Sequence, residues 1–286
     1  MGKNNFEFCA FADEAAADLQ GQIKAMTDNG ITMLEIRGIN GKNISDTTKD
    51  EAKKIKRELD DNGIKVWAIG SPTGKSELGN DDFNEVFEKF CYMLELAGIL
   101  GAQRYRLFSF YGISSRMPET DFKSKRDELI ERLNRFAQKA KDSSVVLCHE
   151  NEKDIYGEKA PECLDIHKSI PGIKAVFDPA NFIQAGEDVL QAWEMLEPYV
   201  DYIHIKDAKK DGSVVPAGYG IGSLPEIVRR FAKIGGKVLT LEPHLSVFSG
   251  SDGLERGETK IENFVYPSQR AAFDAAAKAM KKIAMK

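Results

Sequence analysis

Short apolar runs alternate with amphipathic stretches along the whole chain of 286 residues. The runs predict strands at 6–12, 33–39, 65–70, 104–110, 145–150, 173–178, 202–207 and 238–244. The stretches that follow them predict helices at 15–29, 47–62, 82–98, 121–142, 163–169, 188–197, 224–234 and 267–285, several of them ended by glycine or proline. Because parallel strands need helical crossovers, this alternation predicts an α/β fold with a parallel sheet.

The number of repeats in this length favours closure of the sheet into a single-domain (β/α)8 TIM barrel that covers 1–286. An open, doubly wound sheet is the alternative. No GxGxxG motif follows the first predicted strand, which removes the usual dinucleotide-binding reason to prefer the open sheet.

Composition narrows the class of protein. With 42% hydrophobic residues the chain can bury a sizeable core, and its net charge of −5 provides no large positive field for a nucleic acid or an anionic membrane. The four cysteines show no CxxC spacing, and no apolar stretch approaches the roughly 20 residues that cross a bilayer. We therefore expect a cytoplasmic protein with reduced thiols and neither a nucleic-acid nor a membrane partner.

Four consecutive predicted strands end in side chains that can ligate a metal. These side chains are Glu150, Asp178, His204 and Glu242. In a barrel of this class, catalytic groups come from the carboxyl ends of the strands, so the four should meet in one site. Carboxylates with a single imidazole suit one divalent metal, Mn²⁺ first, with Mg²⁺, Co²⁺ or Zn²⁺ as alternatives. Four buried polar groups paired with one another or with Lys and Arg would be the purely structural alternative.

Alternation of side chains along each strand indicates which neighbours face the same way. Cys148, Val176, Tyr202 and Thr240 should point into the barrel with the four candidate ligands, and so should Lys206 and His244. On the second strand, Glu35 and Arg37 point inward by the same rule. His149 has the outward parity of a packing residue, and His167, within a predicted helix, is expected at the surface or an interface.

Together these positions resemble a known family. The residues that carry the resemblance are Glu150, Asp178 within FDPANF, His204 within HIKD, the GYGIG loop at 218–222, and Glu242 within LEPH. They are similar to the xylose isomerase-like TIM-barrel superfamily, in particular the sugar phosphate isomerase/epimerase branch with its ketose 3-epimerases, hydroxypyruvate isomerases and inosose dehydratases. The likeness covers nearly the whole chain in element order.

The resemblance implies a metal that holds a substrate carbonyl and the neighbouring hydroxyl, and that stabilises an enediolate when the C–H bond between them is broken. By motif position, Glu150 and Glu242 would be the acid and base, while Asp178 and His204 would mainly be ligands. The expected substrate contacts are Glu35, Arg37, Asn181, Lys206, Asp207, Lys210 and His244.

Three positions depart from the epimerase pattern. Asn181 stands where a histidine is common, Tyr156 where a second glutamate is common, and Lys210 where an arginine is common. These differences leave the substrate open.

The sequence therefore predicts a metal-dependent isomerase or epimerase of a sugar or sugar derivative. A lyase or dehydratase could use the same site on a keto-sugar or inosose. An apurinic-type endonuclease is disfavoured by an acidic chain with only four histidines. A non-catalytic sugar-binding barrel is the remaining alternative, and a homodimer and a homotetramer both stay open.

Overall fold

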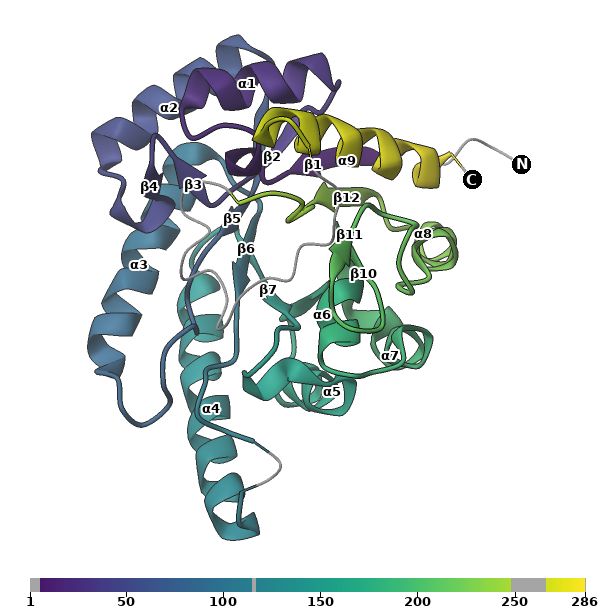
Figure 1. The fold of residues 1–286 in the computed structure, drawn as a ribbon. Helices are drawn as coiled ribbons and strands as arrows, with labels where there is room; N and C mark the ends of the chain where they lie inside the picture. The colour runs from purple at the N-terminus through teal and green to yellow at the C-terminus, as the bar shows by residue number, and fades with distance from the viewer. Residues whose placement is uncertain (1–5, 115–116, 248–265, 286) are drawn as a thin grey trace.

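A closed barrel of parallel strands forms the centre of the molecule (Figure 1). The computed structural model describes residues 6–114, 117–247 and 266–285. The barrel strands are β1 (Glu7–Ala10), β2 (Met33–Ile36), β5 (Lys65–Gly70), β6 (Arg104–Leu107), β7 (Val146–Glu150), β8 (Lys174–Phe177), β9 (Val200–Ile205) and β12 (Val238–Leu241). Pairing of β1 with both β2 and β12 closes the ring. The predicted (β/α)8 barrel is confirmed.

Helices surround this barrel on the outside (Figure 1). They are α1 (Leu19–Asp28), α2 (Lys49–Asp61), α3 (Phe83–Leu100), α4 (Glu119–Ala140), α5 (Ala160–Ser169), α6 (Pro179–Gln184), α7 (Val189–Leu196), α8 (Leu224–Lys233) and α9 (Gln269–Ala284). Short 3₁₀ turns occur at Ala12–Glu14, Ile44–Asp46, Tyr156–Glu158 and Glu197–Tyr199. Within the described residues, no helix is both long enough and apolar enough to cross a membrane.

Side-chain caps explain where several helices begin. Thr48 and Glu51 form a reciprocal capping box at the start of α2. Asp82 caps α3, and Ser268 caps α9. Each of these side chains accepts a hydrogen bond from a backbone N–H that has no partner within the helix, which fixes the point where the chain leaves the preceding loop.

Several strands are shorter than the apolar runs that predicted them. The run at 33–39 divides at Arg37 into β2 and a small hairpin of β3 (Gly38–Ile39) with β4 (Lys42–Asn43). The runs at 104–110 and 238–244 end as strands at Leu107 and Leu241. Arg37 and Glu242 come directly after β2 and β12 and line the site, so these two wrong boundaries fall where the site begins.

Two apolar clusters confirm the predicted alternation of side chains. Cys148, Val176 and Tyr202 pack inside the barrel with Cys9, Met33 and Val238. Leu147, Phe177, Ile203 and Leu241 instead belong to the larger cluster between the barrel and the helices. The inner cluster closes one part of the barrel with apolar groups, so the polar residues of the same parity gather beyond it, toward the carboxyl ends of the strands.

The prediction that His167 lies at the surface or an interface is wrong, because the side chain is buried within the chain itself. Only 3% of His167 is exposed, and its ring stacks on Tyr199 with centroids 4.9 Å apart. His149 is buried as well, and its Nε2 atom lies 3.0 Å from the Ser109 hydroxyl. Burial lowers the pKa of His149 to about 3 and that of His167 to about 4. Both imidazoles are therefore neutral packing groups at neutral pH.

We expect the free energy of unfolding to fall as the pH drops from 7.5 to 5.0, with about 2 kcal/mol of the loss due to His167. Above pH 6.5, the ordinary pKa of histidine, His167 is neutral in both the folded and the unfolded protein. Below pH 6.5 it is protonated in the unfolded protein, whereas in the folded protein it stays neutral down to about pH 4. Protonation therefore favours the unfolded protein in this pH range. Urea unfolding of the wild type and His167→Gln at both pH values measures this term. Equal losses in the two proteins would contradict it.

Candidate metal and active site

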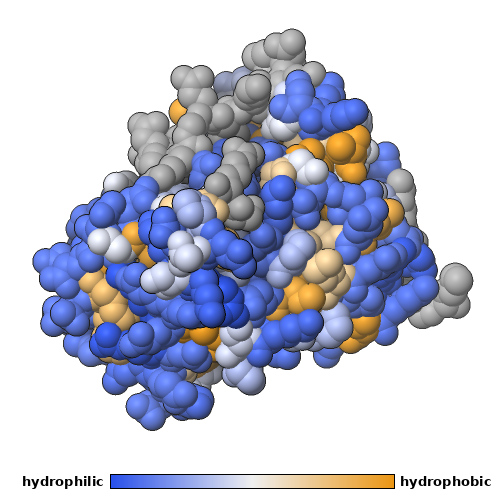
Figure 2. Space-filling model, turned by 90° about the horizontal axis from the view of Figure 1, so that it is seen from below, coloured by the Kyte–Doolittle hydropathy of each residue, from blue (hydrophilic) through white to orange (hydrophobic). Residues whose placement is uncertain are grey.

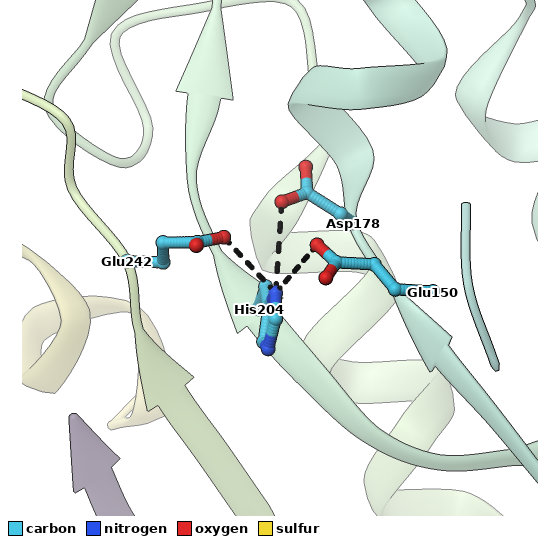
Figure 3. A group of neighbouring side chains, drawn as sticks. All are labelled: Glu150, Asp178, His204 and Glu242. Carbon is cyan, nitrogen blue, oxygen red and sulfur yellow. Dashed lines mark hydrogen bonds and ion pairs between the residues drawn. The ribbon is translucent and has the colours of Figure 1, made fainter. Parts of the chain in front are cut away.

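The four candidate ligands meet at the carboxyl ends of adjacent strands (Figure 3). Glu150 ends β7, Asp178 directly follows β8, His204 lies in β9, and Glu242 directly follows β12. One possible donor atom from each of the four lies within 4.8 Å of those of the others. All four side chains are almost completely buried, between 0% and 3% exposed. The predicted convergence of these side chains is thus present in the structure.

His204 lies at the centre of the group. Its Nδ1 atom is 2.9 Å from Glu150 Oε1, 3.0 Å from Glu242 Oε2 and 3.8 Å from Asp178 Oδ2. In Figure 3, Glu242 reaches this nitrogen from the upper left and Glu150 from the upper right. Burial alone would lower the pKa of His204, but the surrounding carboxylates outweigh burial and raise it well above its ordinary value.

Glu35 supports His204 from the other side of the ring. Its Oε2 atom lies 3.2 Å from His204 Nε2, and its Oε1 atom accepts a hydrogen bond from the Tyr202 hydroxyl at 2.9 Å. A carboxylate on the far nitrogen fixes the tautomer and orientation of a ligating histidine. Glu35 is fully buried. The structure therefore gives Glu35, predicted as a substrate contact, a role in holding His204.

The two carboxylate oxygens of Asp178 have different partners. Oδ1 accepts the Asn181 backbone N–H at 2.9 Å and caps α6, while Oδ2 lies 3.0 Å from Lys206 Nζ. The side-chain amide of Asn181 donates to the Asn151 carbonyl at 2.8 Å and approaches Glu150 Oε1 at 3.5 Å. Asn181 therefore borders Glu150 and ties the ends of β7 and β8 together.

Cationic side chains accompany the carboxylates of the site. Lys206 lies 3.4 Å from Glu242 Oε2 as well as beside Asp178. Arg106, on β6, donates to Glu150 Oε2 at 2.9 Å. These cations, with His204, hold the pKa of Glu150 and Glu242 below the ordinary value despite burial, which acts in the opposite direction. Both glutamates are therefore ionised, as a metal ligand or a general base must be.

Arg37 connects Glu242 to the turn after β1. Its guanidinium donates to Glu242 Oε1 at 3.0 Å, to both oxygens of Asp13 at 2.9 and 3.1 Å, and to Glu14 at 3.3 Å. Glu14 also accepts the backbone N–H of His244 at 2.7 Å. Arg37 and Glu14 together fix the chain on both sides of Glu242.

His244 adopts a left-handed backbone conformation, with φ of 45°, immediately beyond this connection. Its Nε2 atom lies 3.4 Å from Glu14 Oε1 and 3.6 Å from Glu242 Oε1. Non-glycine residues with positive φ are uncommon and need support from their surroundings, which Glu14 provides here. His244 thus lines the site next to Glu242. From this position it can contact a substrate or support Glu242.

Asp207 organises the glycine-rich loop after β9. Its carboxylate accepts backbone N–H groups from Ala208 and Gly222 on Oδ1 and from Gly218 and Gly220 on Oδ2, at 2.8 to 3.0 Å. The loop amides thus bind an anion supplied by the chain itself. Lys210 is exposed in the turn between β10 (Asp207–Ala208) and β11 (Val214–Val215). Neither side chain joins the four-ligand cluster.

Replacing Asp207 with asparagine should lower the free energy of unfolding by on the order of 3 kcal/mol. The amide would present an N–H group to loop N–H donors and would remove the charge that strengthens the remaining bonds. Urea unfolding measures the change, and Asp50→Asn, at an exposed position on α2, is the matched control. A loss no larger than that of the control would show that the loop does not depend on this carboxylate.

The residues fit a divalent cation. Buried carboxylates outnumber buried lysine and arginine side chains around the site. The carboxylates are Asp13, Glu14, Glu35, Glu150, Asp178 and Glu242, and the cations are Arg37, Arg106 and Lys206. Three carboxylates and one imidazole can supply a mixed O and N donor set of the kind that Mn²⁺, Mg²⁺, Co²⁺ and Zn²⁺ accept. Additional positive charge at this position would be favourable because buried carboxylates are costly without compensation.

Some residues take part in the site although the sequence did not predict them, among them Asp13, Glu14, Lys75 and Arg106. Arg106 occupies a strand position that alternation could have aimed inward, as it did Arg37. Asp13 and Glu14 follow the first strand at the same end of the barrel as the candidate ligands. Tyr156, noted as a departure from the epimerase pattern, instead donates to Asp165 at 2.8 Å.

Comparison with known proteins identifies the family of this fold. The family model described as xylose isomerase-like TIM barrel matches residues 23–282, and the chain belongs to this family. No curated protein matches the sequence.

Three solved structures illustrate the range of similar folds. A probable 3-DHS dehydratase, AsbF, of Bacillus anthracis is 15% identical, with 96% of this chain and 98% of that chain covered and a TM-score of 0.74. D-psicose 3-epimerase from Clostridium cellulolyticum H10, in a structure with D-tagatose, is 17% identical over 97% and 98%, with a TM-score of 0.73. The IOLI protein, with a zinc atom, is 15% identical over 97% and 98%, with a TM-score of 0.72. At these identities the likeness concerns the fold.

Proposed function

We propose that the protein is a divalent-metal-dependent isomerase or epimerase of a sugar or sugar derivative. The observation that carries the proposal is the placement of two ionised, buried glutamates, Glu150 and Glu242, which converge on the Nδ1 atom of His204 from two directions (Figure 3). An isomerase that moves a proton on carbon needs a group to remove it and a group to return it. Family membership and an epimerase among the similar folds support this choice.

Glu150, Asp178, His204 and Glu242 would hold the ion, with Mn²⁺ as our first choice. When bound, the ion would polarise a substrate carbonyl and stabilise the negative charge that develops as the adjacent C–H bond breaks. One glutamate would take the proton and the other would return it from the opposite side. Glu35 would keep His204 oriented, and Arg37 would keep Glu242 in place.

Solvent exchange tests the proposal directly. The purified protein, loaded with Mn²⁺ in deuterated water, should exchange a C–H hydrogen of a ketose or keto-sugar with solvent, and EDTA should abolish the exchange. A panel of ketoses followed by proton NMR measures this. Exchange that persists unchanged in EDTA, or no exchange on any member of the panel, would contradict it. A product mass lower by that of water would identify a dehydratase instead.

A further inference from the structure

A group of cationic side chains faces the same small cavity as the two glutamates. The residues lining this cavity are Arg37, Lys75, Arg106, Glu150, Glu152, Lys206, Glu242 and His244. A neutral sugar needs hydrogen-bonding groups but does not need buried positive charge. The way in which each of these cations is held therefore bears on the charge of the substrate.

Arg37 is the cation least able to bind a substrate. Two of its nitrogens hold Asp13, and further contacts hold Glu14 and Glu242. Its positive charge is therefore compensated by Glu242, which lines the cavity, and by Asp13 and Glu14 outside its lining. Its role is to position Glu242, and a ligand would have to break several buried ion pairs to recruit it.

Arg106 is held differently. Its Nη1 atom donates to Glu150 at 2.9 Å and its Nη2 atom to the Ser71 carbonyl at 3.3 Å, whereas its Nε–H is buried and has no hydrogen-bond partner among the residues that the structure describes. Only 5% of Arg106 is exposed. The guanidinium carbon lies 4.7 Å from the Phe108 ring centroid and 5.3 Å from that of Phe11. The aromatic rings fix the guanidinium plane, and one donor stays unused.

Lys75, from the loop after β5, brings a second positive charge to the same place. Its Nζ atom lies 4.3 Å from the Phe108 ring centroid, and it pairs with Glu152 at 2.9 Å. Both cationic groups therefore lie over one aromatic ring. In this structure one carboxylate compensates each of these charges, Glu150 for Arg106 and Glu152 for Lys75.

From these contacts we propose that the cavity binds an anionic group of the substrate, a carboxylate or a phosphate, through Arg106 and Lys75. The inference rests on the proposed function, in which a metal ion bound by Glu150 would weaken the ion pair that this glutamate makes with Arg106. A buried guanidinium that loses a carboxylate partner is costly, and an anionic substrate group would replace that partner. The unused Nε–H provides one of its donors.

Binding of small anions tests this inference without turnover. We would titrate acetate, methyl phosphate and neutral ethylene glycol into the Mg²⁺-loaded protein and measure heats of binding. At least one anion should bind ten times more tightly than ethylene glycol, and the better anion distinguishes a carboxylate from a phosphate substrate. Arg106→Gln should weaken anion binding at least tenfold, since a charge-assisted hydrogen bond contributes about 1.5–3 kcal/mol. Lys75→Met should weaken it less.

The controls separate a local effect from a general loss of charge. Arg229→Gln on α8 and Lys24→Met on α1 remove exposed cations and should leave binding unchanged. Arg106→Lys keeps the charge but loses the planar guanidinium with its paired N–H donors. Its affinity for the anion should lie between those of the wild type and Arg106→Gln. Anion binding by Arg106→Gln equal to that of the wild type, or ethylene glycol binding as tightly as both anions, would overturn the inference.

The two proposals can fail separately. Solvent exchange on neutral ketoses that is as fast as on matched keto-acids and ketose phosphates would overturn the anionic subsite and leave the isomerase proposal standing. Tight anion binding that depends on Arg106, without exchange on any ketose, would support the anionic subsite and overturn the isomerase proposal.

Discussion

Replacing Glu242 with glutamine should lower kcat for solvent exchange by about a thousandfold on whichever ketose the wild type accepts. Glutamine preserves the size of the side chain and one oxygen for a metal, but it cannot carry a proton. Since Glu242 lies 3.0 Å from His204 and is held by Arg37, the variant side chain should occupy nearly the same place. Exchange rates at saturating Mn²⁺ measure the effect.

Bound metal must be determined in the same samples, because loss of the ion would also abolish exchange. Glu226→Gln, at an exposed position on α8, is the control for the chemical change and should retain the wild-type rate. A Glu242→Gln protein that keeps its metal and exchanges within threefold of the wild type would exclude Glu242 as the proton carrier.

Removing Arg37 should produce the largest loss of stability. We expect Arg37→Ala to lower the free energy of unfolding by about 3–5 kcal/mol, because Asp13, Glu14 and Glu242 would stay buried without their shared cation. Urea unfolding provides the measurement. The exposed Arg229→Ala should cost about 0–1 kcal/mol.

Arg37→Lys is the second variant of this test, in case the alanine variant does not fold. It retains a positive charge but cannot hold both oxygens of Asp13 and reach Glu242 at once. Its stability should lie between those of the wild type and Arg37→Ala. Values for both variants equal to that of Arg229→Ala would show that the buried ion pairs contribute nothing to the fold.

The barrel and the four-ligand cluster could be predicted because both depend on local patterns. Strand and helix periods alternate in sequence order, and a parallel barrel places the carboxyl ends of its strands at one rim. Glu150, Asp178, His204 and Glu242 each occupy such an end. Once alternation set their parity, their convergence followed from the topology without knowledge of any contact.

The partners of these residues could not be predicted in the same way. Asp13, Arg37 and Glu242 meet only when β1, β2 and β12 close the ring, and no local pattern marks an aspartate after the first strand as a partner of a glutamate 229 positions later. Asp207 resembled a substrate contact because it follows the strand that carries His204. Its carboxylate turns instead to the backbone of its own loop. Such contacts form only in the folded barrel, so the sequence pattern of a single strand does not reveal them.

The most direct test of the site is the number of divalent ions bound per chain. Titration with Mn²⁺, followed by electron paramagnetic resonance of the free ion, should show one tight site in the wild type. Asp178→Ala and His204→Ala should lose that site, while Asp50→Ala, a change at an exposed position on α2, should keep it. No tight site in the wild type, or the same tight binding after loss of Asp178 and His204, would contradict a metal centre at the ends of these strands.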